Sequence, residues 1–313
     1  MFRQNRTLPK TESLETFVTI VDTGSLSAAA RRIGVSKSVV SQRLASLEDE
    51  LGVRLLQRSA RKLRMTNEGS AFYDVAVRLV RDLQEAAATL AERQGVLVGP
   101  LRLSAPMSFS VLHLGRALFP FMEKHPQIDL YVDLNDRMVD VMGEGFDMAV
   151  RIGRLPDSSL VARKLTTSRR VVVMSPDYAD RHGLPRSLED LEEHEAITYA
   201  LSRIQNDWQF SVGGKTETVR IRSRFQVNNG ELQRDAAIAG LGIALIPTFI
   251  VSDAIASGKL IVAPLGAEPL VDTVYAVYPQ NRHLSAKVRV LADHLRATFG
   301  DPPYWDKNIF DSE

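Results

Sequence analysis

The sequence contains no cysteine, which excludes disulfide bonds, thiolate metal sites and a cysteine nucleophile. It also has no apolar run that approaches the ~20 residues of a membrane-spanning helix, so no membrane contact is expected. The basic residues at the N-terminus are not followed by an apolar stretch, which argues against a secretory signal. Together these absences favour a cytoplasmic protein.

Enzyme motifs are missing as well: there is no Walker loop, nucleophile elbow or HExxH. Gly240-Leu241-Gly242 lacks the third glycine of a dinucleotide-binding loop, and a turn into a strand is the simpler interpretation. The histidines lack the spacing of metal ligands, and surface or capping roles are expected for most of them: His113, His125, His182, His194, His283 and His294. We therefore expect no catalytic residue, no metal and no cofactor.

The chain does contain enough residues for several domains. Its 313 residues predict two or three domains, and its 25% charged and 44% hydrophobic residues are typical of a globular protein with a buried core. The net charge of +1 hides an asymmetry, because residues 1–64 hold 12 Lys+Arg and 6 Asp+Glu, whereas residues 65–313 hold 27 and 32. A basic front on an acidic body indicates a polyanionic partner, unless the imbalance is an accident of the surface.

Two short helices are predicted ahead of a tight turn. Apolar residues recur on one side of Leu14–Thr23, and Gly24 ends that helix. An alanine-rich second helix over Leu26–Ile33 allows close packing, and a glycine then turns the chain into a third helix. The core of this unit is expected to contain Ala28, Ala29, Gly34, Val40, Leu44 and Leu47.

The third helix is predicted to begin at Ser36 and to end at Gly52. Its later turns carry the acidic Glu48–Glu50, which phosphate repels, so it should enter a DNA major groove by its N-terminal end. Helical bundles also contain amphipathic helices joined by glycine turns, and these features alone leave that alternative open. Side chains that suit base edges and phosphates gather in the first two turns: Ser36, Lys37, Ser38, Ser41, Gln42 and Arg43.

A basic hairpin is predicted after the third helix. Val53–Leu56 and Leu63–Thr66 have the character of two short strands. The hairpin resembles a wing that reaches for the phosphate backbone through Arg58, Arg61, Lys62 and Arg64.

The stretch Gly24–Gly69 resembles the DNA-binding head of the LysR-type transcriptional regulators. It departs from the family pattern at Lys37-Ser38, Leu56 and Met65, and the first departure changes the expected base contacts. The resemblance implies a winged helix-turn-helix over residues 1–66 that binds DNA sequence-specifically in bacterial transcription. It is carried by Ser36, Ser41, Leu47-Glu48, Leu51-Gly52, Arg58 and Thr66 through Gly69.

Residues 67–94 are predicted to form one long helix, because they contain no proline and, after Gly69, no glycine. Apolar residues recur there at heptad spacing, which indicates either packing on the chain's own body or pairing with a second copy. The resemblance implies a dimerisation helix that places two heads on dyad-related half-sites of double-stranded promoter DNA, dimers that pair into tetramers, and RNA polymerase as a further partner. The predicted dimerisation residues are Phe72, Ala76, Leu79, Leu83, Ala86 and Leu90.

The body, residues 95–300, alternates strand-like runs with helical patterns, which predicts α/β units with mainly parallel sheets. The resemblance implies a two-lobed effector domain similar to periplasmic binding proteins. Lobe one would take residues 101–165 and 271–300, and lobe two residues 170–264. The composition of the tail, residues 301–313, predicts a solvated end.

A small-molecule effector site is expected between the lobes, because ligands of open α/β sheets bind beyond the carboxyl ends of the strands. A helix that opens after Pro106 would favour an anion such as an organic acid. Capping or turn roles are the alternative for each candidate taken singly. The candidates are Met107, Ser108, Phe109, Asn135, Gly153, Asn228, Asn229 and Pro247.

The predicted function is therefore a homo-oligomeric, LysR-type transcriptional regulator whose promoter binding responds to an effector. A cytoplasmic solute-binding or sensor protein is the first alternative, and it would explain the body without the head. An enzyme of unknown reaction that uses the α/β body is the second alternative, and it would leave the basic head unexplained.

Overall fold

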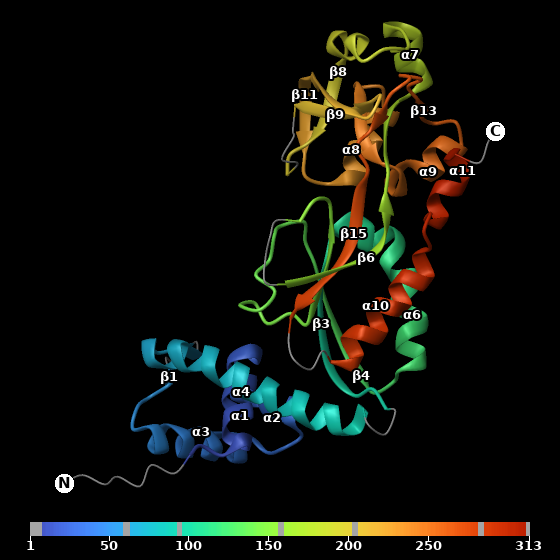
Figure 1. The fold of residues 1–313 in the computed structure, drawn as a ribbon. Helices are drawn as coiled ribbons and strands as arrows, with labels where there is room; N and C mark the ends of the chain where they lie inside the picture. Colours follow the sequence, from blue (N-terminus) through green and yellow to red (C-terminus); the bar gives the residue numbers. More distant parts are fainter. Residues whose placement is uncertain are drawn as a thin grey trace. The chain divides into compact units, whose positions relative to one another are not determined.

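In the computed structural model the chain forms two compact units, Met1–Val96 and Leu97–Glu313 (Figure 1). The structure describes residues 8–58, 63–92, 96–155, 160–201, 206–280 and 285–310. None of the helices in these ranges combines the length and the apolar character that a bilayer span demands. The part of the N-terminal unit that precedes α4 (Asn67–Glu92) is called the head below, and the C-terminal unit is called the body.

Three helices build the head: α1 (Thr11–Thr23), α2 (Leu26–Ile33) and α3 (Lys37–Leu51). The Ser25 hydroxyl caps α2 by accepting the Ala28 N–H at 3.1 Å, and Ser36 caps α3 in the same way. Gly34 adopts a φ of +77°, which only glycine takes readily, and thereby makes the turn between α2 and α3. The predicted third helix is thus confirmed, whereas α1 begins three residues earlier than expected.

The predicted core of the head is largely buried. Ala29, Val40 and Leu47 are fully buried and Leu44 nearly so, around the ring of Phe17. Ala28 is half-buried beside the helix cap, and Gly34 lies exposed at its turn.

The hairpin consists of β1 (Leu56–Arg58) and β2 (Leu63–Met65), which pair antiparallel. Its first strand was predicted three residues too early, at Val53. The reason is local: the N–H groups of Gly52 and Val53 both bond back to the carbonyl of Glu48, so this stretch closes α3 and is not extended.

Helix α4 (Asn67–Glu92) follows the hairpin as one continuous element. Its start packs on the head, where the Phe72 and Tyr73 rings lie 5.9 and 6.3 Å from the ring of Phe17. Ala76 is fully buried in the same cluster.

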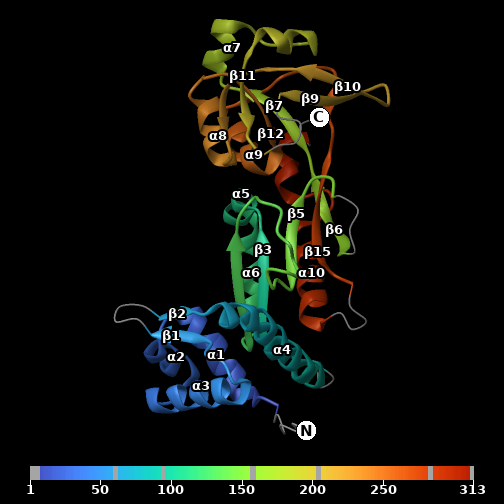
Figure 2. The same cartoon turned by 90° about the vertical axis from the view of Figure 1, so that its left-hand side faces the viewer.

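Lobe one of the body contains a five-stranded sheet in the order β4-β3-β5-β15-β6 (Figure 2). The strands are β3 (Gly99–Ala105), β4 (Ile128–Leu134), β5 (Met148–Ile152), β6 (Leu160–Ser168) and β15 (Asp272–Pro279). A helical stretch links β3 to β4 through α5 (Met107–Phe109), the π-helical η1 (Ser110–Leu114) and α6 (Gly115–Lys124). Helix α10 (Ala286–Phe299) packs against α6 and β6.

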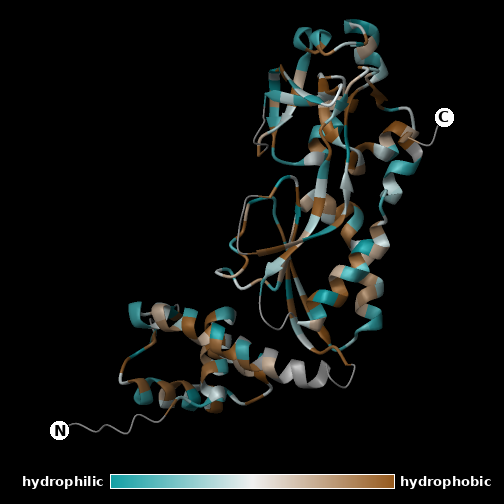
Figure 3. Cartoon of the chain, in the orientation of Figure 1, coloured by the Kyte–Doolittle hydropathy of each residue, from teal (hydrophilic) through white to brown (hydrophobic). Residues whose placement is uncertain are grey.

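Lobe two contains a second five-stranded sheet in the order β11-β8-β12-β7-β13 and a three-stranded sheet, β10-β9-β14. Its strands are β7 (Arg170–Met174), β8 (Glu195–Tyr199), β9 (Asp207–Val212), β10 (Lys215–Arg220), β11 (Arg222–Val227), β12 (Ile243–Pro247), β13 (Ile261–Val262) and β14 (Glu268–Pro269). Its helices are α7 (Pro176–His182), η2 (Glu189–Glu193), α8 (Gly230–Ile238) and α9 (Thr248–Ala256). Hydrophobic segments, brown in Figure 3, run along the strands of both lobes and along α9.

The expectation of mainly parallel sheets was wrong, because both five-stranded sheets are mixed. Strand β3 is parallel to β4 and β5, and β8 is parallel to β11 and β12. Strands β15 and β7 pair antiparallel with their neighbours. These two strands enter their sheets from the crossings between the lobes, at Arg169 and at 270–271, and such short links hold no crossover helix of the kind that parallel pairing needs.

The prediction of a solvated tail was also wrong. Residues beyond Gly300 form η3 (Tyr304–Asp306) and α11 (Lys307–Phe310), which pack on α9. Trp305 is only 4% exposed in a cluster of aromatic rings. The composition of the tail concealed this, because the rings that bury Trp305, such as Phe109, lie far away in the sequence.

Candidate functional site

The first two turns of α3 present polar side chains on the surface of the head. Lys37, Ser38 and Gln42 are exposed, and Ser41 is half-buried. The Ser36 hydroxyl lies 2.7 Å from that of Ser38 and accepts the N–H of Val39 at 3.4 Å. This end of α3 is therefore fixed by its cap while its donors face outward.

Arg43 lies on the same helix but is engaged within the head. Its guanidinium lies 2.5 Å from the carboxylate of Glu12 on α1, and its side chain is 25% exposed. The sequence could not predict this ion pair, because the two residues are 31 positions apart.

Glu48, one of the three acidic residues that were expected only to be repelled by phosphate, is buried. It is 5% exposed, and one carboxylate oxygen accepts the N–H of Leu55 at 2.8 Å and that of Leu56 at 3.1 Å. The other oxygen lies 2.6 Å from the guanidinium of Arg54, which is 73% exposed. The neighbouring Asp49 remains exposed. Glu48 therefore holds the entry to β1 against α3 and positions Arg54.

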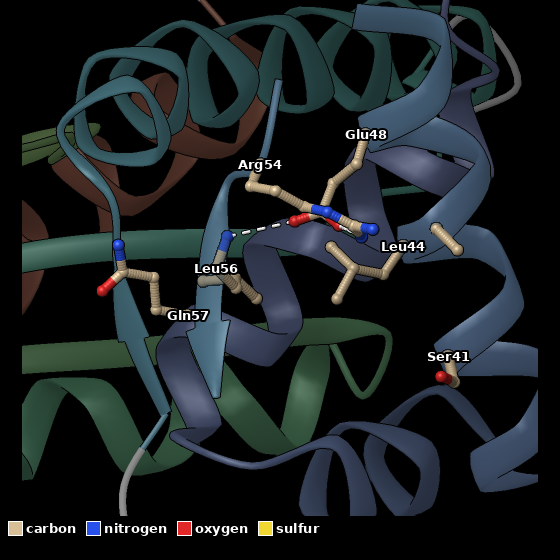
Figure 4. Close-up of a pocket in the computed structure, with 7 residues that line it drawn as sticks. Ser41, Leu44, Glu48, Arg54, Leu56 and Gln57 are labelled. Carbon is tan, nitrogen blue, oxygen red and sulfur yellow. Dashed lines mark hydrogen bonds and ion pairs between the residues drawn. The ribbon is translucent and has the colours of Figure 1, made fainter. Parts of the chain in front are cut away.

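A pocket of about 530 Å³ lies between α3 and β1 (Figure 4). In Figure 4 Glu48 points from α3 toward the backbone of Leu56 and toward Arg54. The accepted hydrogen bond and the negative charge of Glu48 raise the pKa of Arg54 above its ordinary value. The pocket is lined by Ser41, Leu44, Ala45, Glu48, Arg54, Leu56 and Gln57.

The Thr-x-x-Gly motif fixes the other end of the hairpin. The Thr66 hydroxyl donates to the carbonyl of Arg54 at 2.7 Å and accepts the N–H of Gly69 at 2.8 Å, which caps α4. A Cβ on Gly69 would lie 2.0 Å from the carbonyl oxygen of Leu55. Only glycine therefore lets α4 pass this close to the strand.

The predicted wing residues are placed as follows. Arg64 is exposed on β2 opposite Gln57, and the backbone of Arg58 pairs with Leu63. Arg61 and Lys62 lie outside the described residues. Sequence reasoning missed Arg54, because a strand was expected where the end of α3 and the Glu48 contact lie.

The predicted dimerisation stripe divides into two parts. Phe72 and Ala76 pack into the chain's own head, which corrects their assignment as partner-facing residues. The physical reason is that the first turns of α4 complete the apolar cluster around Phe17. Leu79 and Leu83 are 50% and 51% exposed, and Ala86 is also exposed. The side chain of Leu90 lies outside the described residues.

In the body, two polar contacts join the lobes near α5. The Ser108 hydroxyl donates to the carboxylate of Glu231 on α8 and accepts the N–H of Gly230 at 3.2 Å. Asp136, just after β4, accepts the N–H of Met107 at 3.1 Å and a hydrogen bond from Tyr199 of lobe two. Burial raises the pKa of Asp136 and that of Tyr199.

Several effector candidates have structural roles. Phe109 is fully buried among aromatic rings, which corrects its assignment as a ligand contact. Asn229 caps α8 by accepting the N–H of Leu232 at 2.8 Å, as the capping alternative anticipated. Gly153 follows β5 and Pro247 ends β12. Asn228 is exposed after β11, and the Asn135 amide donates to Asp133.

Sequence reasoning also missed Arg151, which is only 7% exposed on β5. Its guanidinium donates to the Ser104 hydroxyl at 2.8 Å and to the carbonyl of Val150 at 2.6 Å. Burial lowers its pKa, while Asp136 acts in the opposite direction. A buried cation held by neutral groups beside the inter-lobe contacts is suited to receive an anion.

Known proteins place both units in one family. Residues 11–70 match the family described as bacterial regulatory helix-turn-helix protein, lysR family, and residues 94–300 match the LysR substrate binding domain. The chain is 34% identical to the HTH-type transcriptional regulator CrgA of Neisseria meningitidis over 93% of its length and 97% of that protein. It is 33% identical to the regulator DmlR of Escherichia coli over 94% and 96%.

Solved structures agree with these matches. The structure of CrgA, a LysR-type regulator from Neisseria meningitidis, aligns with a TM-score of 0.57 at 30% identity, over 91% of this chain and 99% of that one. The full-length virulence activator AphB of Vibrio cholerae aligns with a TM-score of 0.59 at 28% identity, over 92% and 99%. The chain therefore belongs to the LysR-type transcriptional regulators. It is a DNA-binding regulator with an effector-binding domain and is not an enzyme.

Proposed function

We propose that the exposed first turns of α3 read base edges, while Arg54, Arg64 and the wing contact phosphates on either side. The observation that carries this proposal is the fixed N-terminal end of α3, with Lys37, Ser38 and Gln42 exposed together. Buried Glu48 removes one acidic charge from the presented surface, which favours an approach by DNA. The head would end at residue 66, where Thr66 caps α4.

Replacing Ser38 and Gln42 together with alanine should abolish sequence-specific binding and spare non-specific binding. Each base contact is expected to contribute about 1–3 kcal/mol of discrimination, so the ratio of specific to non-specific affinity should fall by about 2–6 kcal/mol. The ratio is measured by fluorescence anisotropy on a genomic fragment selected by the unmodified protein and on a scrambled fragment. Ser46→Ala, an exposed serine later in α3, is the matched control. An unchanged ratio in the double variant would remove α3 from base reading.

Two chains are proposed to pair through α4 and to place their heads on dyad-related half-sites. Leu79 and Leu83 support this, because two half-exposed leucines at i and i+4 form an apolar ridge on one helix face. We also propose that two dimers pair into a tetramer and that the regulator contacts RNA polymerase. These two proposals rest on family membership.

Replacing Leu79 and Leu83 together with serine should dissociate the dimer, because each buried leucine contributes about 1.5–3 kcal/mol. Sedimentation velocity over a concentration series gives the dimer dissociation constant. Leu201→Ser, at a matched exposure of 53% in lobe two, should leave the constant unchanged. Equal constants for the double variant and the unmodified chain would show that the ridge lies outside the dimer interface.

The effector is proposed to be a small organic acid that binds between the lobes and is anchored by Arg151. Buried Arg151, the Ser104 hydroxyl and the Ser108 hydroxyl supply donors for a carboxylate. Glu231, which accepts from Ser108, would be displaced by the effector. Binding would then shift the lobe arrangement and thereby the affinity for the promoter.

Isothermal titration with a panel of mono- and dicarboxylic acids tests the ligand class. Arg151→Gln should weaken the binding of any acid that binds by about 1.5–3 kcal/mol, or ~10- to 150-fold, because a charge-assisted hydrogen bond is lost. Arg154→Gln, at an exposed position just beyond β5, serves as the charge-matched control. A panel that yields no binding, or equal affinities for the Arg151 variant, would contradict this proposal.

A further inference from the structure

The last residues of the chain pass from lobe one to lobe two. The segment Asp301–Phe310, called the C-terminal clamp below, leaves α10 of lobe one at Gly300. It then runs through η3 and α11, both of which contact α9 of lobe two. The clamp therefore contacts both lobes, beside the point where β6 continues into β7.

Trp305 seats the clamp in a cluster built from both lobes. Its ring lies 5.7 Å from Phe109 and 5.9 Å from Phe299 of lobe one, and 6.3 Å from Phe249 of lobe two. The His113 ring is closer still, at 4.4 Å. Offset and edge-on packing of this kind fixes orientation as well as burying area.

A hydrogen-bonded histidine ties the same three elements together. The Nε2 atom of His113 lies 2.8 Å from the carbonyl oxygen of Phe249, and because a carbonyl only accepts, Nε2 carries the proton. Burial lowers the pKa of His113, so Nδ1 is left as an acceptor for the Tyr304 hydroxyl at 2.7 Å. His113 therefore connects lobe one to lobe two and to the clamp with one ring.

Polar contacts anchor the clamp at the crossing between the lobes. The Thr166 hydroxyl near the end of β6 donates to the carbonyl of Gly300 at 2.6 Å. The ammonium group of Lys164 lies 2.7 Å from the carboxylate of Asp301. At the far end, the guanidinium of Arg169 lies 4.4 Å above the ring of Phe310, and Arg169 is the single residue between β6 and β7.

We propose that the C-terminal clamp sets the angle between the two lobes by holding α9 of lobe two against η1 of lobe one. Without the clamp, the crossings at Arg169 and at 270–271 and the contacts around α9 would hold the lobes, and their relative orientation would spread over a wider range. A change in that angle would alter regulation only if the effector response proposed above also holds. Phe109, which packs on Trp305, directly follows Ser108, so the clamp adjoins the contact with Glu231 that an effector would displace.

The absence of native cysteine allows a direct test with spin labels at Glu123→Cys on α6 and Glu189→Cys on η2, both exposed positions in different lobes. Labelled chain is diluted with excess unlabelled chain, so that only distances within one chain are measured by pulsed electron resonance. The intact chain should give one narrow inter-lobe distance distribution. Trp305→Leu and a chain that ends at Gly300 should both give a broader or displaced distribution.

The chain offers a matched control, because its second tryptophan, Trp208, is 3% exposed within the separate core of lobe two. Trp208→Leu should leave the inter-lobe distribution unchanged. Tyr304→Phe removes only the hydroxyl, which bonds to His113 and to Arg116 of α6, and should broaden the distribution in a chain of unaltered fold. The proposal would be overturned if Tyr304→Phe left the inter-lobe distance distribution unchanged and if Trp305→Leu or the chain that ends at Gly300, whichever is folded, did so as well. The experiment uses neither DNA nor effector, so its outcome is independent of the effector proposal.

Discussion

Gly69→Ala should unfold the head under conditions in which the unmodified chain is folded. Alanine is favoured over glycine by about 1 kcal/mol inside a helix. Here, however, its Cβ would lie 2.0 Å from the carbonyl oxygen of Leu55, which is backbone and has no rotamer to change. Overpacking a tight site costs about 1–3 kcal/mol and occasionally more, and a 2.0 Å contact with backbone belongs at the upper end. The clash therefore outweighs the gain in helix propensity.

The free energy of unfolding of the head is expected to fall by about 3 kcal/mol or more. This loss is best measured for each region separately, because thermal unfolding of the full chain combines the head and the body. Hydrogen-exchange mass spectrometry should show lost protection in peptides from α1, α2 and α3, with the peptides from the body unchanged. Ser70→Ala, an exposed position one residue further along, should retain full protection. Retained protection in the Gly69 variant would mean that α4 can move away from Leu55 at little cost.

Glu48→Ala should have the second-largest effect, because it leaves the N–H groups of Leu55 and Leu56 buried without an acceptor. Each unsatisfied buried group costs about 1–3 kcal/mol, so the two together are expected to lower the stability of the head by about 2–6 kcal/mol. The ion pair with Arg54 adds little, because that guanidinium is 73% exposed and screened by solvent. Affinity for DNA should fall as well, since the hairpin loses its attachment to α3.

Three substitutions separate these effects. Glu48→Gln keeps one acceptor oxygen and should lose less stability than Glu48→Ala. Asp49→Asn removes the neighbouring exposed charge and should leave stability unchanged. Exchange protection in the head and operator affinity are measured for all three variants. Equal stability of Glu48→Ala and Asp49→Asn would show that the buried hydrogen bonds of Glu48 contribute nothing.

The head was predictable from sequence because its determinants are local. Glycine turns, serine caps and apolar spacing fix α2 and α3 within a few residues of where they act. The role of Glu48 was missed because an acidic residue beside Asp49 and Glu50 has the appearance of a solvated helix end. Only the return of the chain at Leu55 shows what its carboxylate binds. The ion pair of Arg43 was unpredictable for a related reason, since its partner Glu12 lies on another helix.

The body was harder to predict, because its decisive contacts are distant in sequence. The strands were recognisable from apolar runs, but the antiparallel entry of β7 and β15 depends on how the chain crosses between the lobes. The tail was misjudged because Trp305 finds its partners up to ~200 positions away, in Phe109 and His113. Arg151 drew no attention in the sequence, since its burial follows from the sheet and not from its neighbours.

DNase I footprinting on genomic fragments captured by the full-length protein tests the central claim most directly. A homodimeric regulator that reads DNA with α3 should protect two patches related by a dyad, with centres about 10 base pairs or a multiple of that spacing apart. The Ser38→Ala, Gln42→Ala double variant should leave both patches open at the same protein concentration. Protection that is independent of sequence, or a footprint that the double variant reproduces, would contradict the account.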